Sequence, residues 1–126
     1  MRVLVVDDSQ VMRGILKRAL KHVGVKHIDE ACNGIDALKL YEVGKYGLVI
    51  TDIIMDDMDG IELIKQIRGK TDSQMMVVCS SMGQQDFVVE AMKNGAMDFI
   101  IKPFKVDGLI HHLRQILEKV EYLGKN

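Results

Sequence analysis

The segment VLVVDD, residues 3–8, is an apolar run that ends in two aspartates. An uninterrupted run of this kind is typical of a strand in a sheet that is covered on both faces. Further short apolar runs follow along the chain, at residues 48–50, 75–79 and 99–101, with a weaker one at 27–31. Together these runs predict five strands.

Between and after these runs, apolar residues recur at the spacing of amphipathic helices. The five sets are Val11, Ile15, Leu16, Ala19 and Leu20; Ile35, Leu38, Leu40 and Tyr41; Ile61, Leu63, Ile64 and Ile67; Phe87, Val88, Ala91 and Met92; and Leu109, Leu113, Ile116, Leu117 and Val120. The expected helix ends are marked by Gly24, Gly44, Gly69 and Gly95. Strict alternation of strand and helix, with right-handed crossovers, predicts a doubly wound α/β domain with helices on both faces of a parallel sheet.

Length and composition narrow the possible functions. The chain has 126 residues, so we expect residues 1–126 to form one domain. The 17 basic and 18 acidic residues give a net charge of -1, and neither nucleic acid nor an anionic membrane is an expected partner. The sequence has no recognisable signal peptide and no apolar stretch long enough to span a membrane, so we expect a cytoplasmic protein. Cys32 and Cys79 lack metal-site spacing and are expected to be reduced core thiols.

Polar residues follow four of the five predicted strands. The first ends in Asp7-Asp8, the third in Asp52, the fourth in Ser80-Ser81 and the fifth in Lys102-Pro103. Ligands of such sheets bind outside the carboxyl ends of the strands, where the strand order reverses. If the order is 2-1-3-4-5, the first and third strands are neighbours, and three carboxylates then meet in one small volume.

Crowded carboxylates must either take up protons or be bridged by positive charge. Oxygen ligands favour a hard cation, and Mg²⁺ is usually held by a few carboxylates, a carbonyl and water. Lys102 would supply a second positive charge at the same edge of the sheet. We find no Cys–His or Ser–His pairing at a predicted strand end, so a general hydrolase is not expected. Phosphoryl transfer to an aspartate suits the site better.

Several motifs, taken in this order, resemble those of the receiver domains of two-component response regulators. They are Val5-Val6-Asp7-Asp8, Asp52-Ile53-Ile54-Met55 with Met58-Asp59-Gly60, then Ser80, then Lys102-Pro103-Phe104. The resemblance covers essentially the whole chain. It is closest to the free-standing chemotaxis type, CheY-like, on the run Cys79-Ser80-Ser81-Met82-Gly83-Gln84-Gln85. It implies a flavodoxin-like, CheY-like (βα)5 fold with strand order 2-1-3-4-5.

The resemblance also implies roles for individual residues in phosphoryl transfer. Asp52 corresponds to the phosphoacceptor, and Ser80 and Lys102 correspond to the groups that contact the phosphoryl oxygens. Ser80 and Phe99 correspond to the pair that moves on activation. Their movement is expected to switch the face formed by the fourth helix, the fifth strand and the fifth helix, which partners read.

A second set of roles concerns the metal and the partners. The implied ligands of Mg²⁺, for which Mn²⁺ could substitute, are Asp7, Asp8, Asp52 and the backbone carbonyl of Ile54. The implied partners are a CheA-like sensor histidine kinase, a downstream protein such as a flagellar motor switch protein, and a phosphatase. The chain is expected to be a monomeric signalling phosphoacceptor rather than an enzyme, with self-phosphorylation from small phosphodonors and self-dephosphorylation.

The sequence departs from the family pattern at positions that could tune the site. Asp56 stands where the family often has proline, and the added negative charge is expected to strengthen metal attraction, or else to hold the loop differently in the metal-free protein. Ile54 and Met82 each lie two residues beyond a key group and are apolar. We expect them at the mouth of the site, where they would hinder an attacking water and prolong the life of the phosphoryl group.

Simpler interpretations compete with each functional one. Asp7 and Asp8 could be only turn and N-cap residues of the first helix, and Ser80 or Ser81 could cap the fourth. Without the resemblance, Phe99 would be assigned to the core. Asp59 is assigned to helix-start chemistry rather than to a calcium loop, whose ligand spacing is absent.

Three other functions would account for part of this pattern. A haloacid-dehalogenase-type phosphatase also uses an aspartyl nucleophile with Mg²⁺, but it needs an acid two residues later, where this chain has Ile54. A flavodoxin-like electron carrier should have a hydroxyl- and glycine-rich loop after the first strand, where this chain has Asp7-Asp8. A docking module that is independent of phosphorylation would not need the set Asp8, Asp52, Ser80 and Lys102.

Overall fold

The computed structural model describes residues 1–55 and 57–124. Strands and helices alternate as the periodicity predicted. In chain order they are β1 (Arg2–Val6), α1 (Gln10–His22), β2 (His27–Ala31), α2 (Gly34–Leu40), β3 (Leu48–Asp52), α3 (Gly60–Arg68), β4 (Met76–Ser81), α4 (Gln85–Lys93), β5 (Asp98–Lys102) and α5 (Val106–Gly124). Within the described ranges, no helix combines the length and the apolar character needed to cross a bilayer.

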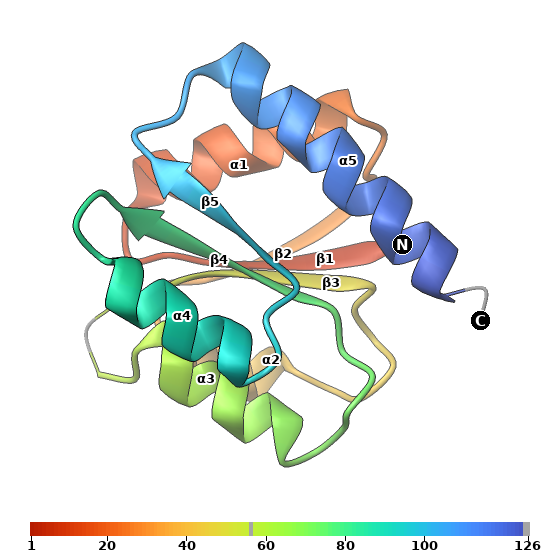
Figure 1. Ribbon diagram of the computed structural model, residues 1–126. Coiled ribbons are helices and arrows are strands. Elements are labelled where there is room, and N and C mark those ends of the chain that lie inside the picture. The colour runs from red at the N-terminus through yellow and green to blue at the C-terminus, as the bar shows by residue number, and fades with distance from the viewer. Residues whose placement is uncertain (56, 125–126) are drawn as a thin grey trace.

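The five strands form one parallel sheet in the order β2-β1-β3-β4-β5. Figure 1 shows α1 and α5 on one side of the sheet and α2, α3 and α4 on the other. The predicted doubly wound, flavodoxin-like and CheY-like fold is therefore confirmed, together with its strand order. The order reverses between β1 and β3, which places the expected ligand crevice outside the carboxyl ends of these two strands.

The core consists of two apolar clusters, one on each face of the sheet. Along β1, Leu4 and Val6 belong to the cluster under α2, α3 and α4, whereas Val3 and Val5 belong to the cluster under α1 and α5. Successive side chains of a strand point to opposite faces, so a strand covered on both sides must be apolar throughout. All four residues are at most 1% exposed, which explains the uninterrupted apolar run at residues 3–6.

Side chains cap the first three helices. Ser9, Asn33 and Asp59 each accept a hydrogen bond from the backbone N–H three residues further on, at the starts of α1, α2 and α3. The helix-start role assigned to Asp59 is therefore confirmed. The N-cap interpretation of Asp7 and Asp8 is wrong, because Ser9 caps α1.

The start of α3 packs directly against the end of β3. The N–H of Gly60 donates to the carbonyl of Ile53 at 2.7 Å. A Cβ atom at Gly60 would collide with the backbone carbonyl of Asp52, so only glycine permits this approach. The strand end that carries Asp52 and the first turn of α3 are thereby fixed to each other.

Some expectations about individual residues are wrong. Cys79 is buried, but Cys32 is exposed and directly follows β2, so it is a surface thiol at a strand end rather than a core thiol. Val11 and Ile35 are 71% and 44% exposed, because helical spacing marks an apolar face without saying how far the neighbouring elements cover it. Gly44 lies beyond the end of α2 at Leu40 and does not terminate it.

Candidate functional site

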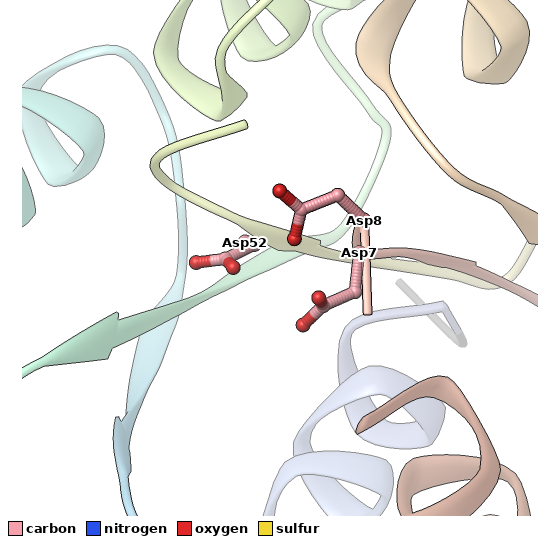
Figure 2. Close-up of side chains that lie close together, drawn as sticks. All are labelled: Asp7, Asp8 and Asp52. Atoms are coloured by element: carbon pink, nitrogen blue, oxygen red, sulfur yellow. The ribbon is translucent and has the colours of Figure 1, made fainter. Parts of the chain in front are cut away.

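The carboxyl ends of β1 and β3 bring three carboxylates together. Val6 pairs with Thr51 in the register of these strands, so the residues that follow, Asp7 and Asp52, come level. Asp7, Asp8 and Asp52 each offer one carboxylate oxygen, and these oxygens all lie within 4.8 Å of one another. Figure 2 shows the three side chains gathered where the two strands end. The sequence predicted this convergence.

Lys102, at the end of β5, reaches across to the carboxylates. Its Nζ donates to Oδ2 of Asp7 at 2.7 Å and to Oδ2 of Asp52 at 2.9 Å. The lysine side chain is 14% exposed and that of Asp7 only 1%, so these ion pairs are largely shielded from water. Three carboxylates and one ammonium leave a formal charge of two negative units at this edge of the sheet.

Burial and the close contact between Asp52 and Lys102 shift the pKa values of both groups. Burial raises the pKa of Asp52, hydrogen bonding and attraction from Lys102 oppose the rise, and the neighbouring charge of Asp7 adds to it. Burial would lower the pKa of Lys102, but its hydrogen bonds to Asp7 and Asp52 outweigh that effect and raise it. The ammonium is therefore held charged, while Asp52 ionises less readily than a solvated aspartate.

Hydrogen bonds that involve backbone groups hold the loop that carries Asp7 in place. Its Oδ1 accepts from the N–H of Ser9 at 2.9 Å, and its own N–H donates to the carbonyl of Ala31 at 3.1 Å. The carbonyl of Asp7 accepts from Nη1 of Arg13 at 2.7 Å, and the same guanidinium pairs with Glu30 through Nε at 3.2 Å. Arg13 was not identified from the sequence, because no motif marks a lysine or arginine that supports a loop through a backbone carbonyl.

The donor set fits a hard divalent cation. All three carboxylates supply oxygen, the chemistry that Mg²⁺ prefers. The surplus of two negative charges equals the charge of one such ion. Asp8 is exposed, which leaves a side open to water, and Mg²⁺ usually keeps several waters.

Ser80, on β4, is fully buried, and its hydroxyl oxygen has no hydrogen-bond partner among the residues that the structure describes. A buried polar atom without a partner is costly and calls for an explanation. The residue lies one position beyond Cys79, which pairs with Asp52 in the sheet. Neither Ser80 nor Ser81 caps α4, whose N-cap residue is Gln84, so the capping interpretation of these serines is wrong.

A largely apolar groove begins beside Ser80 and runs between α4 and β5. Its volume is about 820 Å³, and its lining includes Ser80, Met82, Val88, Met92, Phe99 and Ile101. Phe99 is 38% exposed within it. The core interpretation of Phe99 is therefore wrong. The groove places Ser80 beside a surface of exposed apolar side chains.

The two tuning residues that lie within the described ranges are both exposed. Ile54 is 50% exposed and Met82 is 80% exposed. Asp56, the third candidate, lies outside the described residues. Gln84, to which the sequence analysis gave no role of its own, accepts a hydrogen bond from the N–H of Ser81 at 2.8 Å.

Comparison with known proteins identifies close relatives. The response regulator receiver domain, as a sequence family, matches residues 3–114. The chain is 42% identical to the chemotaxis protein CheY of Listeria monocytogenes over 115 residues, which cover 91% of this chain and 97% of that protein. It is equally identical, over the same share of its length, to the chemotaxis protein CheY of Thermotoga maritima, of which 96% is covered.

Solved structures agree with the sequence comparison. The receiver domain of NtrX from Brucella abortus matches with a TM-score of 0.82 and 32% identity, covering 92% of this chain and 98% of that one. The chemotaxis response regulator CheY4 of Vibrio cholerae matches with a TM-score of 0.81 and 25% identity, covering 91% and 97% of the two chains. Fold, strand-end site and relatives agree, and the chain belongs to the family of response regulator receiver domains.

Proposed function

We propose that residues 1–126 act as one receiver domain, in which Asp52 accepts a phosphoryl group from a sensor histidine kinase. The observation that carries the proposal is the convergence of Asp7, Asp8 and Asp52 beside the ammonium of Lys102. Like-charged groups this close are unfavourable unless a cation or a reaction makes use of them. The match to the receiver family over residues 3–114 supports the same reading.

The chemistry asks little of the protein beyond position and charge. A carboxylate oxygen of Asp52 attacks phosphorus, and the bond from phosphorus to the donor atom breaks. The product is an acyl phosphate on Asp52, and the departing imidazole of a phosphohistidine donor takes up a proton. Lys102 already lies 2.9 Å from an oxygen of Asp52, and its ammonium would offset charge on the transferred group.

Asp7, Asp8, Asp52 and the backbone carbonyl of Ile54 would hold Mg²⁺, or Mn²⁺ in its place. When bound, the ion would offset negative charge on the equatorial phosphoryl oxygens. Two features would favour binding of the ion. The site has a surplus of two negative charges, and hydrogen bonds hold the loop of Asp7 in place.

The buried hydroxyl of Ser80, which has no hydrogen-bond partner among the described residues, supports a switching role. Phosphorylation adds about -1.5 to -2 charges and three strong acceptor oxygens, which would give this hydroxyl a partner. A movement of Ser80 would open space beside the groove in which Phe99 stands half exposed. The face formed by α4, β5 and α5 would then change shape for a downstream partner.

The pathway is proposed from the relatives. Proteins named for chemotaxis are 42% identical to this chain, so we assign it to a chemotaxis pathway in the cytoplasm. Its kinase would be CheA-like, its target a protein such as a flagellar motor switch protein, and a phosphatase would complete the cycle. We assign no turnover of external phosphate esters, because Ile54 stands where a phosphatase of this chemistry needs an acid.

Acetyl phosphate or beryllofluoride with Mg²⁺ tests the proposal. Intact-mass measurement should show one added phosphoryl group with acetyl phosphate, and none when Asp52 is replaced by Asn. Beryllofluoride should shift the NMR signals of Phe99 and Ser80. A full mass gain in the Asp52→Asn variant, or no gain in the parent, would overturn the proposal, and release of nitrophenol from nitrophenyl phosphate would favour the phosphatase alternative.

A further inference from the structure

The backbone N–H of Ser81 points toward the strand-end site. It donates a hydrogen bond to a side chain of the loop between β4 and α4. In a parallel strand the N–H and C=O of one residue point to one neighbour and those of the next residue to the other. The carbonyl of Cys79 accepts from Ile53 at the end of β3, whereas the carbonyl of Met76 accepts from Met97, just before β5. Ser81, two residues after Cys79, therefore directs its N–H toward the β3 side, beyond the end of the strand that carries Asp52.

The partner of this N–H is the side chain of Gln84, whose Oε1 accepts from it at 2.8 Å. The contact closes the short loop between β4 and α4. Gly83 has a φ of 92°, a conformation that side-chain-bearing residues rarely adopt, and this allows the chain to fold back on itself.

The loop closes at the expense of the helix that follows. Gln84 is the N-cap residue of α4, yet its side chain makes no hydrogen bond to the first turn of that helix. Helices usually gain stability from a side-chain cap at this position, as α1, α2 and α3 do here. The Gln84 carboxamide thus satisfies a strand-end amide while α4 begins without a side-chain cap.

We propose that Gln84 is an internal latch, which occupies in the unphosphorylated protein the amide that a phosphoryl oxygen on Asp52 would take. The inference rests on the proposed function of Asp52. Both acceptors compete for one N–H, so occupancy by the phosphoryl group releases Gln84 and opens the loop. Ser81, Met82 and Gly83 belong to the loop and line the groove beside Phe99, so opening the loop reshapes the groove. Gln84 is a positioning residue that sets how strongly the switch favours its resting form.

The test compares Gln84→Ala with Gln85→Ala in the full chain. Gln85 is the matched control, because it is an adjacent, exposed glutamine. In the metal-free protein, the amide of Ser81 should shift and exchange its hydrogen faster only in Gln84→Ala. With Mg²⁺ present, beryllofluoride should bind Gln84→Ala more tightly, by about fivefold, the equilibrium equivalent of one neutral hydrogen bond. Gln84→Glu keeps an acceptor and adds a negative charge, so it should bind beryllofluoride more weakly than the parent.

The outcomes separate the latch from other roles. If Gln84 only supported the fold, Gln84→Ala would melt at lower temperature and bind beryllofluoride no more tightly than the parent, which would overturn the latch. Equal affinities of Gln84→Ala and Gln85→Ala in a protein that does bind beryllofluoride would overturn the latch alone. A parent protein that neither binds beryllofluoride nor gains mass from acetyl phosphate would overturn the latch and the proposed function together.

Discussion

Replacing Lys102 with methionine removes the ammonium between Asp7 and Asp52 and keeps most of the apolar length of the side chain. Two charge-assisted hydrogen bonds of 2.7 and 2.9 Å are lost, and each such bond is worth about 1.5–3 kcal/mol. Asp7 is 1% exposed, so its carboxylate would remain poorly hydrated. Removing one partner of a buried ion pair costs about 3–5 kcal/mol.

The side chains of Lys102 and Asp52 are each 14% exposed, so water relieves part of this cost and we expect the lower end of that range. The free energy of unfolding should fall by about 3 kcal/mol. For a urea dependence of about 1.5 kcal/mol per molar, the unfolding midpoint should fall by about 2 M. The assay is urea unfolding followed by circular dichroism at neutral pH with a metal chelator. Lys105→Met is the control, because Lys105 is exposed and its replacement should change stability by no more than about 0.5 kcal/mol.

Magnesium provides a second readout of the same variant. Without Lys102 the site carries three negative charges in place of two. Millimolar Mg²⁺ should therefore restore more stability to Lys102→Met than it adds to the parent. A metal-free midpoint equal to that of the parent, or an equal magnesium response in both proteins, would refute this account of the site.

Three further variants probe other contacts. Tyr46→Phe removes the 2.7 Å hydrogen bond that the Tyr46 hydroxyl donates to Asp29. This bond lowers the pKa of the Asp29 carboxyl. A lowered pKa stabilises the fold at pH values above the pKa of a free aspartate, and this stabilisation is lost in acid. Urea unfolding should therefore show a loss of about 1 kcal/mol near neutral pH and a smaller one near pH 3, and an equal loss at both pH values would contradict the assignment. Ile54→Asn places a polar group where a half-exposed apolar one now lies, so the phosphorylated protein should lose its phosphoryl group faster. Intact-mass measurement over time follows this loss, and equal or slower loss in the variant would discredit a shielding role for Ile54. Asp56→Pro removes one negative charge four residues after Asp52 in the sequence, so calorimetry at low salt should show weaker Mg²⁺ binding, and unchanged affinity would reject the charge argument.

The strand-end carboxylates could be predicted from two patterns in the sequence. Short apolar runs mark the strands, and the helical spacing of apolar residues between the runs marks the helices. Residues 3–6 are apolar without interruption, which identifies a doubly covered strand, and the acids directly follow it. Once β1 and β3 are neighbours, their register leaves Asp7 and Asp52 level. The position of Lys102 follows from the same edge of the sheet.

Exposure and loop contacts could not be predicted in the same way. The run at residues 99–101 reads as uniformly apolar, yet in β5, an edge strand, only Ile100 is buried and both Phe99 and Ile101 stand half open. Sequence does not say which face of an edge strand a helix will cover. The contact between Gln84 and Ser81 depends on a positive φ at Gly83 and on the direction of one amide, and neither leaves a periodic trace in the sequence.

The contact between Gly60 and the end of β3 makes the two walls of the site mechanically unequal. On one side, the first turn of α3 is locked to the backbone of Asp52 and leads into a helix whose Ile61, Leu63 and Ile64 are buried. A shift of Asp52 would therefore have to drag a whole packed helix with it. On the other side, a single side-chain contact closes the turn after β4. If Asp52 is phosphorylated as we propose, we expect the loop after β4 and the start of α4 to be displaced more than α3.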